Sequence, residues 1–207
     1  MKNYKMLIEY DGSRYYGWQR QPGRETIQGK LEKVLSLMCQ AEVEVIGAGR
    51  TDAGVHARGM VANACMDTEL PEEEIRAYLN RYLPDDIAVK EVREASPRFH
   101  ARYNAVGKTY CYTCCDGEVK SVFDRKYVTR LEEKPDLEKM LQAADLLKGE
   151  HDFRNFCANN GALCGPDRNY PQGKLYHFYV SRKRLFTEYG AYYGGDSAGS
   201  GLRQDDL

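Results

Sequence analysis

The chain has no excess of charge of either sign, because 30 Lys and Arg residues are balanced by 31 Asp and Glu residues. The formal net charge of −1 excludes a whole-chain positive field, so a nucleic-acid surface would need a local basic patch. The sequence contains no apolar run of membrane-spanning length, and no signal peptide opens it. These absences favour a cytoplasmic protein whose 207 residues form one large or two small domains.

The cysteines do not form the pattern of a disulfide scaffold. There are seven, an odd number at irregular spacing, which indicates a reducing compartment. Cys111, Cys114 and Cys115 lie close together in the sequence. On a strand, however, Cys114 would lie on the opposite face from the other two, and no second Cys/His pair lies at zinc spacing. We therefore expect no metal site here.

Hydrophobic periodicity and capping signals predict an ordered series of helices and strands. Strands are expected at residues 6–10, 42–48, 58–66 and 87–92, and helices at residues 26–39 and 71–82. This βαββαβ order is the split-βαβ pattern of ferredoxin-like folds. A strand starting at residues 110–114 and a helix at residues 137–147 then begin a second half in the same way. The predicted class is α+β.

A single aspartate, Asp52, lies in a turn of small residues between two of the predicted strands. Residues 49–57 read Gly-Arg-Thr-Asp-Ala-Gly-Val-His-Ala. Arg50 would keep the Asp52 carboxylate ionised and aimed at a substrate. An ionised carboxylate on a loop held by two strands suits a nucleophile. The alternative interpretation is a hairpin turn with a surface ion pair.

Further motifs precede and follow this turn. They are the segments Ile8–Gln21, Thr26–Glu32, Phe99–Arg102, Lys108–Tyr112 and Gly149–Phe153, with Phe156 after the last. Together with residues 49–57, they resemble in type and order the motifs of the tRNA pseudouridine synthase A family. The resemblance runs from about residue 4 to about residue 160.

The resemblance implies a pseudouridine synthase fold, in which two ferredoxin-like halves share a mixed, mainly antiparallel sheet. The halves would be residues 1–103, carrying the aspartate, and an incomplete second half starting with residues 104–163. The active site would lie in a basic cleft between them. The implied activity is isomerisation of uridine to pseudouridine in the anticodon stem-loop of tRNA. The implied assembly is a homodimer, with no cofactor, no metal and no membrane.

The same resemblance assigns roles to three residues. Asp52 would be the nucleophile, either attacking the ribose or deprotonating it to a glycal intermediate. Arg50 would pair with Asp52 and help hold the flipped nucleotide out of its stack. Tyr110 would stack on the uracil, with its phenol available for proton transfer at ring carbon five. Without the resemblance, Tyr110 would be interpreted as a core aromatic on a strand.

Several basic residues are candidates for binding RNA. Arg14, Arg20 and Arg24 share a loop with Tyr15 and Trp18, and this basic and aromatic loop is either solvated or grips RNA. Further phosphate contacts are expected from Arg58, Arg98, Arg102 and Lys108. His56 and His100 resemble acid–base groups, but nothing in the sequence pairs them with Asp52. We interpret both as structural or RNA-facing.

The composition changes at about residue 164 and stays different to residue 207. This tail has no Ile or Met, so we expect it to be disordered. We also expect a shifted reading frame, with the break near residues 162–166. Codons can be chosen for residues 167–199 whose neighbouring frame resembles the family's C-terminal half, including an Asn-x-x-Val-Arg motif that supplies an active-site arginine. The chain would then be an inactive or impaired synthase. A non-catalytic RNA-binding module and a defective translation product are the alternatives.

Overall fold

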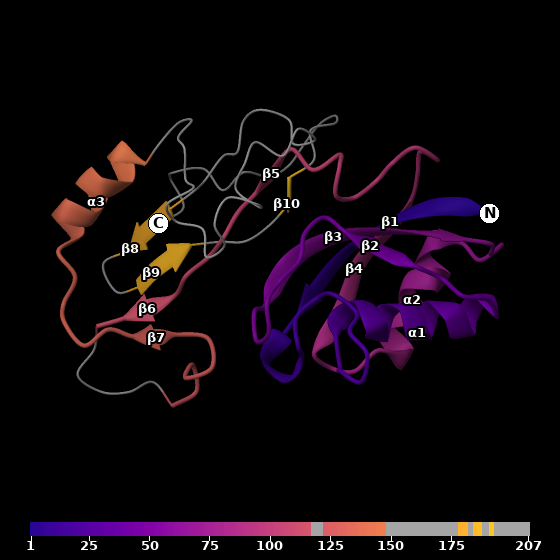
Figure 1. The fold of residues 1–207 in the computed structure, drawn as a ribbon, viewed down its shortest axis with the longest axis horizontal. Helices are drawn as coiled ribbons and strands as arrows, with labels where there is room; N and C mark the ends of the chain where they lie inside the picture. Colours follow the sequence, from indigo (N-terminus) through magenta and orange to yellow (C-terminus); the bar gives the residue numbers. More distant parts are fainter. Residues whose placement is uncertain (117–121, 148–177, 182–183, 188–190, 193–207) are drawn as a thin grey trace.

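A computed structural model describes residues 1–116 and 122–147, together with residues 178–181, 184–187 and 191–192. The first part of the chain forms a four-stranded sheet and two helices (Figure 1). Its elements are β1 (Lys2–Tyr10), a short 3-10 turn (Gly12–Arg14), α1 (Ile27–Cys39), β2 (Val45–Gly47), β3 (Ala57–Met66), α2 (Glu72–Tyr82) and β4 (Ile87–Ala95).

The strand order is β2-β3-β1-β4, and every neighbouring pair is antiparallel. This is the split-βαβ arrangement predicted for the first half of the chain. A register shift between Leu7 and Ile8 against β4 changes the alternation there, so Val89 and Val92 both face inward. The core combines alternate residues of β1, including the fully buried Met6 and Ile8, with buried residues of β3, β4 and both helices.

The two helices form where the sequence predicted them. Thr26 caps α1 by accepting a hydrogen bond from the backbone N–H of Gly29, which satisfies one of the free donors of the first turn. Leu31 and Leu35 are four residues apart, lie on the same face of α1 and are fully buried. Helices α1 and α2 contact each other beneath the sheet (Figure 1). On α2, Ile75 and Leu79 are fully buried, whereas Tyr82 is 56% exposed.

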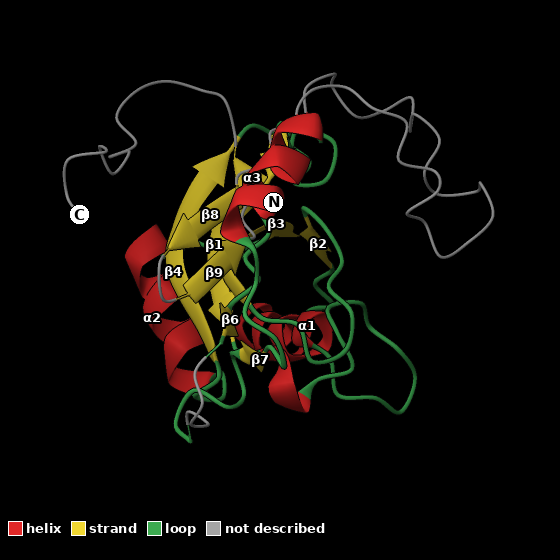
Figure 2. Cartoon of the chain, turned by 90° about the vertical axis from the view of Figure 1, so that its left-hand side faces the viewer, coloured by secondary structure: helices red, strands yellow, loops and turns green. Residues whose placement is uncertain are grey.

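The described residues after residue 104 form short elements. They are β5 (Gly107–Lys108), β6 (Cys114–Cys115), β7 (Thr129–Arg130), α3 (Leu137–Leu146), β8 (Phe178–Ser181), β9 (Arg184–Thr187) and β10 (Ala191–Tyr192). Strands β7, β6, β9 and β8 form one sheet (Figures 1 and 2), and β10 pairs with β5 in another (Figure 1). Neither continues the N-terminal sheet within the described residues, so the shared sheet of two ferredoxin-like halves stays a prediction.

Some predictions for this region change or stay open. The strand expected to start at Tyr110 begins only at Cys114, so Tyr110 lies in the connection between β5 and β6. The motif at residues 149–153 and Phe156 lie outside the described residues, as does the expected frame break. The described parts of the tail are strands β8, β9 and β10. Within the described ranges, no helix is long and apolar enough to cross a membrane.

Candidate active site

Asp52 lies on the connection between β2 and β3, as the sequence predicted, and its side chain is exposed. Thr51 before it and Ala57 after it are buried. The four residues from Asp52 to Val55 are all exposed. The two ends of the loop are therefore buried, and the Asp52 carboxylate between them is exposed to solvent.

The N-terminal end of this loop is fixed by a buried hydrogen bond. The Tyr10 hydroxyl and Thr51 Oγ1 are 2.9 Å apart. Burial raises the pKa of Tyr10 to about 12, against the opposing effect of the hydrogen bond with Thr51. The phenol is therefore protonated at neutral pH and able to donate to Thr51. This contact holds the residue next to Asp52 against the end of β1.

The C-terminal end of the loop is fixed by His56. Its Nδ1 lies 2.9 Å from Asp11 Oδ1 and 3.1 Å from the backbone nitrogen of Gly12. One nitrogen cannot accept from Gly12 and donate to Asp11 at the same time, so the tautomer decides which bond forms. In either state the imidazole joins the loop to the segment after β1. His56 thus has the structural role that was one of its two interpretations.

The pKa of Asp11 is lowered to about 2. Burial acts in the opposite direction, but hydrogen bonds from Ser13 and Tyr127 and the nearby His56 outweigh it. The Tyr127 hydroxyl donates to Asp11 Oδ2 at 2.8 Å, and the Tyr127 ring meets the His56 ring edge-on at 5.1 Å. Asp11 therefore links the loop of Asp52 to a residue of the second half of the chain.

The segment between β1 and α1 packs directly on the loop of Asp52. The backbone N–H of Trp18 donates to the Thr51 carbonyl at 3.0 Å, and that of Gly54 donates to the Tyr15 carbonyl at 3.2 Å. Gly17 has a φ of +85°, and a Cβ there would lie 2.4 Å from the Thr51 oxygen. Only glycine combines this backbone angle with this close approach.

Tyr15 and Trp18, which were expected to be solvated or to grip RNA, are buried side chains of this segment. Trp18 is 2% exposed and Tyr15 is 5% exposed. The Tyr15 hydroxyl donates to Asp86 Oδ1 at 2.6 Å. Burial, followed by Asp86, raises the pKa of Tyr15, which keeps the phenol protonated as a donor. Both aromatic rings therefore pack inside the fold, next to the loop of Asp52, and are not available to stack on RNA. The local sequence did not reveal this supporting role.

The arginines expected to contact RNA differ in their partners. Arg14 binds Asp86 through Nε and Nη2, at 2.8 and 2.7 Å, and Arg20 Nη1 lies 3.3 Å from Glu32 Oε2. Arg24 is placed over the ring of Tyr16. Arg58 and Arg98 are exposed, whereas Arg102 and Lys108 are half-buried. Arg14 and Arg20 are thus already neutralised within the fold.

Arg50 and Tyr110 are both exposed. The ion pair expected between Arg50 and Asp52 is not formed within the described part of the chain, where Asp52 has no cation at ion-pair distance. The expectation assumed that the side chains of Arg50 and Asp52 turn toward each other. On an exposed loop they need not do so, because solvent can solvate each charge separately. Tyr110 is 46% exposed and does not lie in the core position typical of a strand aromatic.

His100 accepts a hydrogen bond from the backbone N–H of Arg102 and stacks on the ring of Tyr103. These contacts give His100 a structural role.

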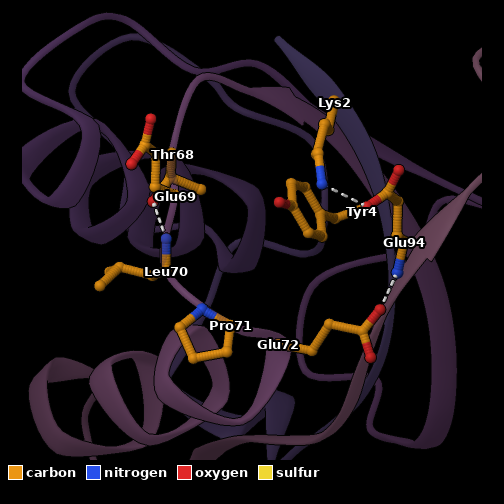
Figure 3. Close-up of a pocket in the computed structure, with 8 residues that line it drawn as sticks. All are labelled: Lys2, Tyr4, Thr68, Glu69, Leu70, Pro71, Glu72 and Glu94. Carbon is orange, nitrogen blue, oxygen red and sulfur yellow. Dashed lines mark hydrogen bonds and ion pairs between the residues drawn. The ribbon is translucent and has the colours of Figure 1, made fainter.

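A separate hollow lies at the opposite end of the sheet (Figure 3). It is lined by Lys2, Tyr4, Thr68, Glu69, Leu70, Pro71, Glu72 and Glu94. The register pairs Lys2 with Met66 at this end and Tyr10 with Ala57 at the end nearest Asp52. The two ends of a nine-residue strand are roughly 25 Å apart. The hollow is therefore not part of the site around Asp52.

Comparison with known proteins identifies the family. A family model described as tRNA pseudouridine synthase matches residues 6–104. A tRNA pseudouridine synthase A of Clostridium perfringens (strain 13 / Type A) is 42% identical over 163 residues, which cover 79% of this chain and 67% of the relative. The chain belongs to the tRNA pseudouridine synthase A family.

Two Bacillus members of the tRNA pseudouridine synthase A family are more similar in sequence. The protein of Bacillus sp. (strain KSM-64) is 51% identical, and one from Bacillus anthracis is 48% identical, each over 157 residues. Each match covers 75% of this chain and 64% of the relative. The chain thus spans a little under two thirds of the length of these relatives. The matched family model includes Asp52 and the loops that support it.

Proposed function

We propose that this chain carries the nucleophile of a synthase that converts uridine to pseudouridine in the anticodon stem-loop of tRNA. The observation that carries the proposal is the exposed Asp52 carboxylate between two anchored loop ends, at Thr51 and His56. An anchored loop positions a reacting group while leaving it accessible. The family, whose members are named for tRNA pseudouridine synthesis, supplies the reaction.

The reaction is an isomerisation that needs no external oxidant or reductant. The bond between ribose C1′ and uracil N1 breaks, and a bond between C1′ and uracil C5 forms. The proton on C5 is released, and N1 gains one. Asp52 acts at the ribose, either by attacking it or by removing a proton to give the glycal. The target uridine must leave its stack, which costs a few kcal/mol.

Tyr110 and Arg50 have supporting roles in this proposal. Tyr110 stacks on the uracil, and one base–aromatic stack recovers about 1–3 kcal/mol. Its exposure supports this role, since a ring buried in the core would not reach a substrate. Arg50, exposed beside Asp52, pairs with the carboxylate or wedges the flipped nucleotide once RNA is bound. Arg58, Arg102 and Lys108 contact phosphates.

We further propose that the 207-residue chain is itself inactive or nearly so, and that the active family member is a homodimer. The proposed inactivity rests on the tail after about residue 164, which has no Ile or Met and whose branched aliphatic residues are Leu and one Val. The homodimer is what the resemblance to the family implies. The first experiment measures tritium release from unmodified tRNA labelled at uracil C5. We expect negligible release from this chain. Turnover at a rate comparable with that of the Bacillus sp. (strain KSM-64) relative would contradict the proposed inactivity.

The role of Asp52 is tested in a chimera in which residues after about 163 are replaced by the C-terminal part of that relative. We expect the chimera to release tritium and the Asp52→Asn chimera to release none, because the nearly isosteric amide lacks the nucleophilic charge. Binding to tRNA should stay within several-fold. Retained turnover in Asp52→Asn would remove Asp52 from the mechanism. A chimera that binds tRNA without turnover would favour a non-catalytic RNA-binding module.

A further inference from the structure

The three arginines of the loop between β1 and α1 have different surroundings. Arg14 and Arg20 are paired with Asp86 and Glu32. Arg24 has no carboxylate at ion-pair distance among the residues that the structure describes. Its guanidinium carbon instead lies 4.2 Å from the centroid of the Tyr16 ring. Arg24 therefore keeps an unneutralised charge on an exposed planar group.

The fold holds this pair together before any ligand binds. The backbone N–H of Tyr16 donates to the Glu25 carbonyl at 2.9 Å, and that of Arg24 donates to the Gln21 carbonyl at 3.3 Å. The Gln21 side-chain amide donates in turn to the Tyr16 carbonyl at 3.1 Å. These bonds bring residues 16 and 24 side by side. Because the two side chains are already in place, a ligand that binds to them pays little entropy for ordering the protein, which favours affinity.

The pair is also next to the loop of Asp52. The residues on either side of Tyr16 contact that loop, since Tyr15 accepts from Gly54 and Gly17 packs against the Thr51 carbonyl. The Tyr16 side chain is itself 48% exposed. An exposed aromatic ring and a cation thus lie together on the segment that packs against the loop of Asp52.

We propose that Tyr16 and Arg24 form a stacking site for one unpaired nucleobase of RNA beside Asp52. Unpaired bases stack on aromatic rings and on arginine guanidinium planes, and a cation adds to the stack. The base stacks on the exposed face of the Arg24 guanidinium, so the tyrosine ring, the guanidinium and the base form one continuous stack. The identity of the RNA as the anticodon arm of tRNA rests on the proposed function, whereas the stacking site rests on the geometry of the pair.

The test uses the 207-residue chain and two labelled RNA hairpins, measured by fluorescence anisotropy. One hairpin is an anticodon arm with its natural loop, and the other has the same stem and an abasic loop. Tyr16→Ala should weaken binding of the natural hairpin by about 5- to 100-fold, the loss of one stacked base. It should leave binding of the abasic hairpin within about twofold, because phosphate contacts do not depend on the ring. Tyr16→Phe should bind both hairpins as the unaltered chain does.

Tyr82 provides the matched control. It is also an exposed tyrosine, and Arg81 lies over its ring at 5.7 Å, but the pair is on α2. Tyr82→Ala should leave both affinities unchanged. Equal losses on the two hairpins, the same loss from Tyr82→Ala, or no binding by the unaltered chain would each overturn the stacking site.

The two proposals fail separately. Base-dependent binding through Tyr16 without tritium release from the chimera would refute the synthase function and leave the stacking site. Tritium release from the chimera together with base-independent binding by Tyr16→Ala would refute the stacking site and leave the synthase function.

Discussion

The position of Asp52 depends on a close backbone contact between Thr51 and Gly17, which leaves no room for a side chain at residue 17. Gly17 lies against the Thr51 carbonyl with a positive φ, so the loop after β1 can approach the loop of Asp52 closely. The site therefore depends on a residue that carries no chemistry of its own.

Gly17→Ala should destabilise the fold by about 3 kcal/mol or more, since it adds backbone strain to a steric overlap. Gly23 is the matched control, because its φ is +68° but no atom lies within 4 Å of an added Cβ. Gly23→Ala should cost only about 1 kcal/mol, from strain alone. Urea unfolding of both variants provides the measurement. Equal effects of the two substitutions would show that the contact with Thr51 is unimportant.

At the scale of elements, a polar network joins the loop after β1 to α1 and β2. Glu32 Oε1 accepts from the Val45 backbone N–H at 3.1 Å and from Gln28 Nε2 at 3.0 Å. Gln28 Oε1 in turn accepts from the backbone N–H of Arg20 at 2.8 Å. Glu32 is buried, and the Arg20 guanidinium lies beside its second oxygen. Arg20 therefore stabilises the fold by pairing with Glu32, which leaves its charge less available to RNA.

Arg20→Ala should lower the free energy of unfolding by about 1–2 kcal/mol, because it leaves the buried Glu32 carboxylate without its cation. The value is below that of a fully buried pair because the Arg20 side chain is 62% exposed. The double variant Arg20→Ala/Glu32→Gln should recover part of the loss. Arg24→Ala, which removes a cation without a carboxylate partner, is the control and should leave unfolding unchanged. A larger effect from Arg24→Ala would contradict this division of roles.

At the scale of the whole molecule, the second half of the chain contacts the site through Tyr127 and Asp11. These residues are 116 positions apart in the sequence, and their hydrogen bond is 2.8 Å long. The bond to Asp11 raises the pKa of Tyr127 and contributes to the lowered pKa of Asp11. The link therefore favours an ionised Asp11 next to His56.

The contribution of Asp11 to stability should depend on pH. Its folded-state pKa of about 2 is below the ordinary value of 3.8, so the ionised carboxylate stabilises the fold above about pH 4. That stability is lost as the pH falls through the folded-state pKa. Asp11→Asn should destabilise the chain by about 1–2 kcal/mol at pH 7, and the difference should shrink between about pH 4 and pH 2.

Denaturant unfolding across this pH range provides the measurement. Tyr127→Phe is the second variant, since it removes only the hydroxyl that donates to Asp11. The two substitutions should be non-additive at pH 7, because they break the same contact. Additive effects, or a constant effect of Asp11→Asn from pH 7 to pH 2, would show that the link does not form.

The sequence by itself determined the N-terminal elements and the place of Asp52. The alternation along β1 and the spacing of Leu31 and Leu35 in α1 are local patterns, so the backbone period could be inferred from them. The resemblance of residues 49–57 to a family motif was equally local. The comparisons then confirmed the family.

Only the tertiary structure decided which neighbours of Asp52 support it and which remain available to RNA. Trp18 and Tyr15 are buried, Arg14 is neutralised by Asp86, and Asp11 meets Tyr127. Each of these facts depends on a partner brought near by the fold, and composition gives no information about such a partner. The exposure of Tyr16 beneath Arg24 similarly depends on the turn that returns residue 24 to residue 16. Side chains that look equivalent in a basic loop thus acquire different roles because their long-range contacts differ.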